Sequence, residues 1–217
     1  MVMVDCYIPT KTIRDRFDII RQFIDGRSVL DLGVVDSRPA KGPACQRIRR
    51  SRGLLFRKIA EANPDTIGVD IDAEGVQVLR EMGYSAQCAD VQTMNLQKQF
   101  DIIIAGELIE HLENPGQFLR NMARHLNKDG VLFLTTPNPF YAKQTWKIWR
   151  YLRPQVQEGH TCWFDPLTLS RLLQRCGFEP FDGYWIQPRL ELLKAWRRLL
   201  RKYFSHSFIL LARVRTK

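Results

Sequence analysis

Short apolar segments alternate along the chain with longer segments in which apolar residues recur every three or four positions. The short segments are rich in Val, Ile and Leu and predict buried strands, whereas the longer ones predict amphipathic helices. The expected strands are 28–33, 66–71, 84–90, 100–106 and 131–136, and the expected helices are 11–25, 52–62, 73–83 and 114–130. Apolar strands that alternate with helices indicate an α/β fold, with a parallel sheet that helices cover on both faces.

The last two strand-like segments, residues 178–186 and 207–214, predict an antiparallel pair at the end of the chain. No linker-like stretch divides the sequence, and 217 residues can bury a sizeable core as one α/β domain. We therefore expect residues 1–217 to form a single domain.

Acidic residues stand where successive expected strands end. Asp31 ends the first strand, Asp70 the second and Asp90 the third, while Gly106 and Glu107 end the fourth. Ligands of parallel sheets bind at the carboxyl ends of the strands. A carboxylate after the second strand can accept both hydrogen bonds of a ribose diol, and one after the third can accept a hydrogen bond from an adenine amino group. Such acids also cap helices and form turns, but their common register favours a nucleoside site.

The turn after the first expected strand lacks the usual run of glycines. Gly33 is present, but Val35 and Ser37 stand where further glycines would follow. Without G-x-G-x-x-G, a dehydrogenase is not expected. A branched residue such as Val35 also fits poorly at a position that needs a positive φ.

Several segments resemble, in order and spacing, the motifs of class I S-adenosylmethionine-dependent methyltransferases of the small-molecule and glycan branch. These segments are VLDLG, GVDID, CADVQ and FDIIIAGELIEHLENPGQFLRNMARHLNKDGVLFLTTPNP, and HTCWFDPLTLSRLLQRCGF resembles a later stretch of the same enzymes. The resemblance implies a Rossmann-like, doubly wound, seven-stranded sheet of order 3-2-1-4-5-7-6 with the last strand antiparallel. It also implies S-adenosylmethionine as the cofactor and substrate-side insertions at about 138–164 and 187–204.

Carried over onto matching positions, the resemblance implies a role for each strand-end residue. The expected cofactor-binding residues are Asp31 and Gly33 at the methionine part, Asp70 at the ribose, Ile71 on the adenine, Asp90 with Val91 at the adenine amino group, and Gly106 and Glu107 under the sulfonium. Asp72 is expected to cap the next helix instead. Because this cofactor has no pyrophosphate that needs a row of amide donors, the turn can lose a glycine and still bind it. A non-catalytic scaffold that has lost the cofactor is the alternative.

Two histidines are the candidate catalytic residues. Methyl transfer to a hydroxyl is helped by a base that removes the proton, and histidine titrates near neutral pH. His111 follows the fourth expected strand, and His160 lies in the expected substrate-side stretch. Each could instead be structural, His111 by fixing Glu107 or Glu110 and His160 as a loop hydrogen-bonding residue. No metal site is expected, because the five cysteines are scattered without a C-x-x-C pair.

The net charge of +10 is concentrated in two segments. Residues 38–58 and residues 189–217 each carry a net charge of +8. Such patches can attract nucleic acid, anionic lipid or a phosphorylated substrate, or can be solvated surface. A nucleic-acid methyltransferase is the less favoured alternative, because the fourth strand lacks an Asn/Asp-Pro-Pro-aromatic signature and no recognition module is present.

Aromatic and basic residues also mark both expected insertions. Residues 138–164 suit a lid over the acceptor or a helix packed on the core, and residues 189–204 suit a basic helix that docks on the sheet or contacts an anionic membrane. We expect a small-molecule, glycan or lipid-linked acceptor. No apolar run is long enough to span a bilayer and no secretory signal is evident, which predicts a cytoplasmic protein with possible peripheral contact at the membrane.

Overall fold

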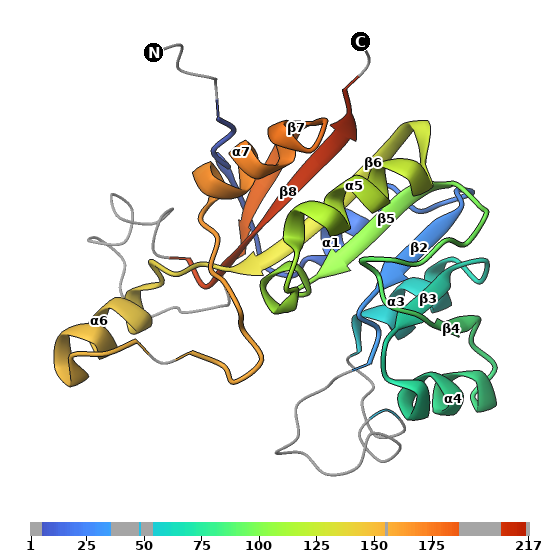
Figure 1. The fold of residues 1–217 in the computed structure, drawn as a ribbon, viewed down its shortest axis with the longest axis horizontal. Helices are drawn as coiled ribbons and strands as arrows, with labels where there is room; N and C mark the ends of the chain where they lie inside the picture. The colour runs from blue at the N-terminus through green and yellow to red at the C-terminus, as the bar shows by residue number, and fades with distance from the viewer. Residues whose placement is uncertain (1–5, 36–47, 49–53, 155, 187–204, 216–217) are drawn as a thin grey trace.

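One mixed sheet organises the part of the chain that the computed structural model describes, which is residues 6–35, 48, 54–154, 156–186 and 205–215 (Figure 1). Its strands are β1 (Lys11–Ile13), β2 (Val29–Leu32), β3 (Ile67–Asp70), β4 (Ala86–Cys88), β5 (Phe100–Gly106), β6 (Leu126–Pro137), β7 (Phe178–Ile186) and β8 (Ser207–Val214). The helices are α1 (Phe17–Ile20), α3 (Leu55–Ala62), α4 (Ala73–Glu81), the short 3-10 helix η2 (Ile109–His111), α5 (Pro115–His125), α6 (Ala142–Tyr151) and α7 (Pro166–Arg175).

The sheet has eight strands within the described residues, in the order β1-β7-β8-β6-β5-β2-β3-β4. The expected number of seven is therefore wrong, because β1 adds a strand beyond β7. Strands β2 to β6 pair in parallel, and β8 runs antiparallel to both of its neighbours, β6 and β7. The carboxyl ends of the parallel strands therefore lie together at the same end of the sheet.

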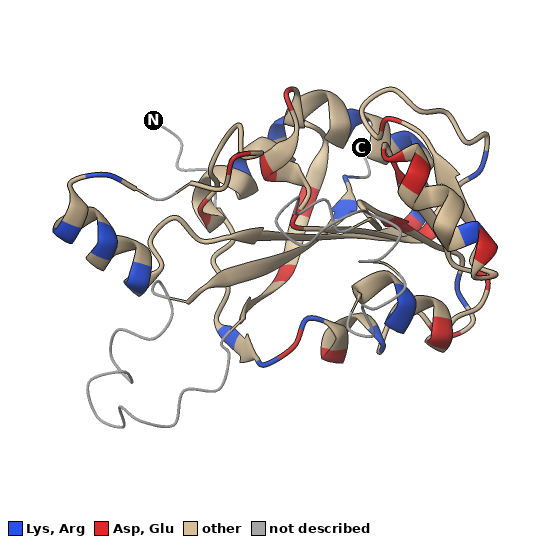
Figure 2. Cartoon of the chain, turned by 90° about the horizontal axis from the view of Figure 1, so that it is seen from below, with Lys and Arg blue, Asp and Glu red and all other residues tan. Residues whose placement is uncertain are grey.

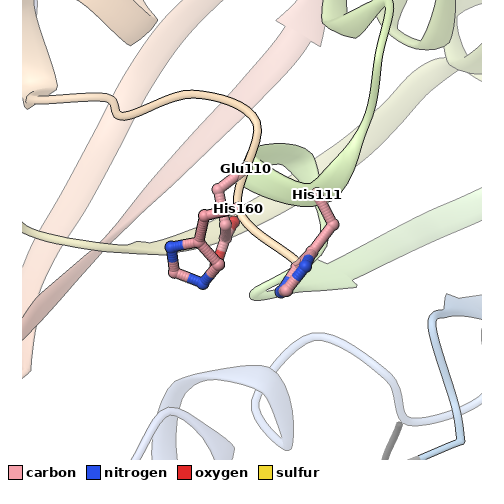
Figure 3. Close-up of side chains that lie close together, drawn as sticks. All are labelled: Glu110, His111 and His160. Carbon is pink, nitrogen blue, oxygen red and sulfur yellow. The ribbon is translucent and has the colours of Figure 1, made fainter. Parts of the chain in front are cut away.

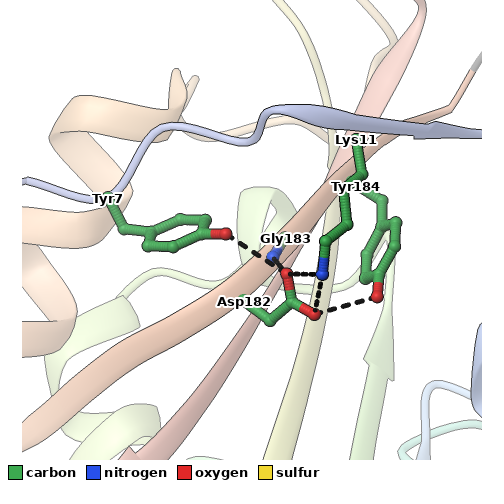
Figure 4. Close-up of polar contacts among 5 residues, drawn as sticks. All are labelled: Tyr7, Lys11, Asp182, Gly183 and Tyr184. Atoms are coloured by element: carbon green, nitrogen blue, oxygen red, sulfur yellow. Dashed lines mark hydrogen bonds and ion pairs between the residues drawn. The ribbon is translucent and has the colours of Figure 1, made fainter.

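The extra strand replaces the first half of the helix expected at residues 11–25. Lys11 pairs with Tyr184 of β7, and its Nζ lies 2.8 Å from Oδ2 of Asp182 (Figure 4). The hydroxyl groups of Tyr7 and Tyr184 also donate hydrogen bonds to the Asp182 carboxylate, at 3.2 and 2.9 Å. The Trp185 indole donates to the Pro9 carbonyl oxygen at 2.8 Å. These long-range contacts outweigh the local helical pattern, and only α1 remains helical.

The expected helix at residues 114–130 also ends earlier than Gly130. Helix α5 stops at His125, and β6 begins at Leu126, which pairs with Phe100 of β5. A Cβ atom at Gly130 would lie 2.8 Å from Cδ2 of Leu126 and 3.0 Å from the Asn127 carbonyl oxygen. The glycine therefore permits a close turn inside the strand rather than closing a helix.

Helices cover both faces of the sheet, as the apolar strands predict (Figure 2). On one face, α5 and α7 pack on Ile103 and Ala105 of β5. On the other face, α1 and α3 pack on Ile102 and Ile104 of the same strand. Because neighbouring residues of β5 point to opposite faces and all four are buried, this strand forms the centre of the core.

Helix α6 lies apart from these layers and extends away from the sheet (Figures 1 and 2). None of its residues is buried, so the alternative of a helix packed on the core is wrong. No helix in the described residues combines the length and the apolar character that crossing a membrane requires. Ser37 and the expected basic helix at 189–204, with the whole insertion at 187–204, fall outside the described residues.

Candidate active site

A cavity of about 340 Å³ opens at the carboxyl ends of β2 and β5. It contains six of the ten predicted site residues, namely Asp31, Gly33, Gly106, Glu107, His111 and His160. The cavity lining also includes Arg16, Glu110, Pro137 and Gln157, together with apolar residues of β2 and α3 and of the turns beside them. A larger cavity of about 830 Å³, between α5 and residues 92–99, contains none of the predicted site residues. The smaller cavity is therefore the candidate active site.

Asp31 places a buried carboxyl group in the lining of this cavity. Burial raises the pKa of Asp31 to about 7, and the nearby Asp70 acts in the same direction, while the Arg16 guanidinium opposes both. A positively charged ligand group beside Asp31 would favour its ionised form. The position thus suits the ammonium of the cofactor's methionine part.

Arg16 is a cavity residue that the sequence did not reveal. Its Nη1 donates to the Thr135 hydroxyl at 3.2 Å and lies 3.8 Å from Oε1 of Glu107. A Cβ atom added at Gly106 would lie 3.3 Å from the same nitrogen. Arg16 was expected inside a long helix, and the pairing of β1 with β7 brings the segment that holds it to the strand ends. The sequence carries no signal that would have identified it.

Within the described residues, the altered turn has one positive-φ residue, Gly33, and is built without a second glycine. Gly33 has φ +72° and its N–H donates to the Val69 carbonyl oxygen, whereas Val35 is absent from the described residues with positive φ. A Cβ atom at Gly75 of α4 would lie only 2.5 Å from Cγ1 of Val35. Gly75 therefore leaves the room that the Val35 side chain needs, so this side chain packs against α4. A glycine of α4, rather than a glycine of the turn, thus provides the space at this position.

Asp70 shapes that turn and does not line the cavity. Its Oδ2 accepts from the Val35 N–H at 2.8 Å, and its Oδ1 accepts from the Asp72 N–H at 3.0 Å. Burial raises the pKa of Asp70 above its ordinary value. Each carboxylate oxygen keeps a second lone pair, which a ribose hydroxyl could still use. Asp72 caps α4, as expected, by accepting from the Gly75 N–H.

The three remaining adenosine-side residues also lie outside the cavity. The Ile71 side chain is 73% exposed, which leaves its surface free for a ring to pack on. Oδ1 of Asp90 accepts from the Gln92 N–H at 2.8 Å, so the turn-forming alternative is present at this position. Val91 is buried in the main core.

The backbone at the end of β5 is strained. Glu107 has φ +52°, which is rare for a residue with a side chain and commonly occurs at functional sites. Two hydrogen bonds hold it there, because its N–H donates to the Thr135 carbonyl oxygen at 2.9 Å and to the Thr135 hydroxyl at 3.0 Å. This turn directs the chain from the floor of the cavity into η2.

His111 and His160 both line the cavity and lie side by side (Figure 3). Their ring centroids are 4.6 Å apart and their planes are perpendicular. Burial lowers the pKa of His160, and the nearby His111 acts in the same direction. Glu110 lies beside them, and burial raises the pKa of its carboxyl group to about 7. The structural alternative in which His111 fixes Glu107 or Glu110 is not seen, because its Nδ1 bonds to the Gly159 carbonyl oxygen.

The insertion at 138–164 reaches the cavity through Gln157 and His160. Helix α6, in the same insertion, contributes no lining residue. The expected lid is thus limited to the segment that follows α6. The described residues therefore supply one cavity whose lining combines a buried carboxyl group with a histidine pair.

Comparisons with known proteins show which family this chain resembles. A family model for a methyltransferase domain matches residues 17–181. A ubiquinone biosynthesis O-methyltransferase of Azorhizobium caulinodans is 30% identical over 113 residues, which cover 46% of this chain and 43% of the relative. A protein of the same name from Hydrogenovibrio crunogenus is 21% identical over 197 residues, which cover 84% and 75%. The chain thus spans less than half of the first relative's length.

Solved structures share the fold at low sequence identity. An S-adenosylmethionine-dependent methyltransferase of Archaeoglobus fulgidus has a TM-score of 0.65 at 16% identity, with 91% of both chains covered. Magnesium protoporphyrin IX methyltransferase of Synechocystis PCC 6803, solved with bound S-adenosylhomocysteine (SAH), has a TM-score of 0.62 at 16% identity. The match covers 92% of this chain and 79% of that protein's chain. These matches confirm the resemblance found in the sequence motifs. The chain belongs to the class I, S-adenosylmethionine-dependent methyltransferase family.

Proposed function

We propose that the chain methylates an oxygen atom of a small-molecule acceptor in the cavity at the ends of β2 and β5. The observation that carries this proposal is that one cavity lining combines two sets of residues. Asp31 with Gly33 and Gly106 forms what we take as the cofactor end, and His111 with His160 forms what we take as the acceptor end. The named relatives are O-methyltransferases, which favours oxygen as the acceptor atom. Neither a scaffold without activity nor a nucleic-acid methyltransferase is favoured by these relatives.

The cofactor end fits S-adenosylmethionine on the chemistry of its own residues. The buried Asp31 carboxylate suits the ammonium of the methionine part. Gly33 and Gly106 leave space that a side chain would fill, since a Cβ atom at either would lie 3.2 to 3.3 Å from a neighbouring side chain. We assign Asp70, Ile71, Asp90 and Val91 to the adenosine, along the ends of β3 and β4.

The residues of this chain orient the acceptor and assist the loss of its proton. The cofactor supplies a methyl carbon whose bond to sulfur breaks, with the electron pair going to sulfur, as an acceptor oxygen lone pair forms the new bond to carbon. The strained turn at Glu107 and the floor at Gly106 hold the donor end in line with the histidines. His111 and His160 contact the acceptor hydroxyl, whose proton passes toward solvent through this histidine pair.

Helix α6 suggests an amphiphilic or lipid-linked acceptor. Its Trp149 side chain is 76% exposed, and Leu152, the first residue after the helix, is 91% exposed. Residues 139–157 also contain four Lys or Arg residues and no acidic residue. Exposed aromatic rings beside basic side chains are typical of helices that lie in an anionic membrane surface. We infer that α6 contacts such a surface, next to the segment that carries His160.

The function is tested by measuring SAH binding by calorimetry and methyl transfer from radiolabelled S-adenosylmethionine to hydroxylated acceptors with and without an apolar tail. We expect one SAH site per chain and transfer to at least one acceptor. Folded protein that binds no SAH at millimolar concentration would contradict the proposal.

The membrane contact is tested separately by co-sedimentation with vesicles. We expect binding to vesicles that contain phosphatidylglycerol, weaker binding to neutral vesicles, and loss of binding in a Trp146→Ala/Trp149→Ala variant. Leu167→Ala, which changes an exposed residue of α7, is the matched control. Equal binding by both variants would rule out α6 as the contact.

A further inference from the structure

Three side chains that can bind a metal ion converge at the acceptor end of the cavity (Figure 3). Glu110 and His111 come from η2, which follows β5 directly, and His160 comes from the loop before α7. One ligand atom from each side chain lies within 4.8 Å of the others. This separation is within reach of a single ion after small rotations of the side chains.

The Glu110 carboxylate in this cluster has one unsatisfied oxygen. The residue is 1% exposed, and its Oε2 accepts a hydrogen bond from the Thr136 hydroxyl at 3.0 Å. Its Oε1 is buried and has no hydrogen-bond partner among the residues that the structure describes. A buried carboxylate oxygen without a partner is costly, and buried charges are normally paired or coordinate a metal. A positively charged partner at Oε1 would stabilise the ionised form of this carboxyl group.

Hydrogen bonds to the backbone orient the His111 ring for the same task. Its Nδ1–H donates to the Gly159 carbonyl oxygen at 2.9 Å, which fixes the tautomer and leaves the Nε2 lone pair free. Ligating histidines are commonly held by such a second bond from the other ring nitrogen. Because Gly159 precedes His160, this bond also joins the two segments that carry the histidines.

Thr161 fastens the same two segments more firmly. Its N–H donates to the Glu110 carbonyl oxygen at 2.9 Å, and its hydroxyl donates to the Leu112 carbonyl oxygen at 2.8 Å. The loop of His160 is thus bound to η2 on both sides of the histidine, through Gly159 and Thr161. The cluster is therefore held together by the backbone, independently of any bond between its three side chains.

We propose that Glu110, His111 and His160 bind one divalent metal ion of the Zn²⁺, Co²⁺ and Mn²⁺ class. Two imidazoles and one carboxylate suit these ions better than Mg²⁺ or Ca²⁺, which prefer sets of oxygen ligands. Three protein ligands leave at least one coordination position open, as in catalytic rather than structural zinc sites. All three residues line the cavity, so the open position faces the space in which the acceptor would lie.

The consequence for catalysis rests on the proposed function. An acceptor hydroxyl at the open position would have a lowered pKa, because a divalent ion stabilises the oxygen anion that remains. The proton would then leave to solvent, and the oxygen would be held toward the methyl donor. With the ion bound, His111 and His160 would act as its ligands, and this route would replace direct passage of the proton through the histidine pair.

The test is calorimetric titration of the full, tag-free chain, stripped with a chelator, with Zn²⁺, Co²⁺, Mn²⁺ and Mg²⁺ in turn. We expect one site that prefers the first three ions, and visible absorption from bound Co²⁺ as a direct sign of nitrogen and oxygen ligation. Glu110→Gln and His160→Asn should each weaken binding by about 100-fold or more. Glu113→Gln and His206→Asn, which change exposed residues outside the cluster, should leave binding unchanged.

Absence of binding at millimolar ion concentration, or equal binding by cluster and control variants, would overturn the inference. Melting curves of the variants show whether they are folded, and His160→Asn lies in a loop where the fold tolerates change. SAH binding measured on the same samples separates the two proposals. SAH binding without metal binding would refute the metal site alone, whereas metal binding without SAH binding would refute the proposed function and leave the metal site standing.

Discussion

The two ends of the candidate active site are built in different ways. The cofactor end consists of residues at the tips of adjacent parallel strands, such as Asp31 of β2 and Gly106 of β5, which the sheet itself holds in place. The acceptor end joins η2 to a loop 49 residues later in the sequence, through Gly159 and Thr161. Changes at the first end should therefore act on cofactor binding, and changes at the second on the acceptor and the proposed metal ion.

The largest effect is expected from Asp31→Asn at the cofactor end. Loss of the carboxylate beside the ligand's ammonium should weaken SAH binding by about 30- to 100-fold in calorimetry. Because the pKa of Asp31 is raised to about 7, wild-type affinity should also fall as the pH is lowered below 7, by about tenfold per pH unit. Equal affinities at low and neutral pH would contradict the contact between Asp31 and the ammonium.

The same substitution should act on stability in the opposite direction. A folded-state pKa above the ordinary value of 3.8 means that the folded chain holds the proton more tightly than the unfolded chain. The free energy of unfolding of the ligand-free wild type therefore falls as the pH rises from about 4 to 7. Asp31→Asn removes this pH-dependent loss of stability. In chemical denaturation, the free energy of unfolding of the variant relative to that of the wild type should therefore increase as the pH rises from about 4 to 7. A constant difference between the two proteins would show that Asp31 is not buried as described.

A smaller effect, at the acceptor end, is expected from Thr161→Val. The variant keeps the N–H bond to Glu110 and loses the hydroxyl bond to Leu112, so the His160 loop should be held less precisely. We expect metal affinity and kcat to fall by about tenfold, with SAH affinity unchanged. Thr145→Val, which changes a hydroxyl on α6, serves as the control. A fall in SAH affinity equal to the fall in kcat would show that a change at the acceptor end also acts on cofactor binding, contrary to the account.

Gly75→Ala tests how the altered turn is accommodated. The new methyl group would meet Val35 at 2.5 Å, so we expect a loss of about 1–3 kcal/mol in the free energy of unfolding. A displaced Val35 would also disturb its bond to Asp70 and weaken SAH binding several-fold. Combining Gly75→Ala with Val35→Gly should restore both quantities. Failure of the double variant to recover would mean that the two positions do not compensate for each other.

The smallest effect is expected at the sheet edge far from both ends. Tyr7→Phe removes one hydrogen bond to Asp182, whose carboxylate keeps its bonds to Lys11 and Tyr184. We expect a loss of about 0.5 kcal/mol in the free energy of unfolding and no change in SAH or metal affinity. A change in the affinity for SAH or for the metal ion would indicate that a displacement of β1 also displaces Arg16.

The same contrast explains what the sequence could predict. The strands from β2 to β8 were predictable from short apolar segments, which in β2 and β5 are buried on both faces. The acids at the strand ends follow from strand position alone. Strand β1 was missed because a long-range cluster around Asp182 decides it, and Arg16 was missed with it. His111 and His160 were singled out separately, but their meeting depends on Thr161 and Gly159. The unsatisfied oxygen of Glu110 has no signature in the sequence at all.

A crystal structure of the chain with bound SAH tests the central claim most directly. The account predicts the SAH ammonium beside the Asp31 carboxylate, the sulfur over Gly106, and the space beyond it bounded by Glu110, His111 and His160. SAH bound elsewhere, or Asp31 without a contact to the ligand, would contradict it.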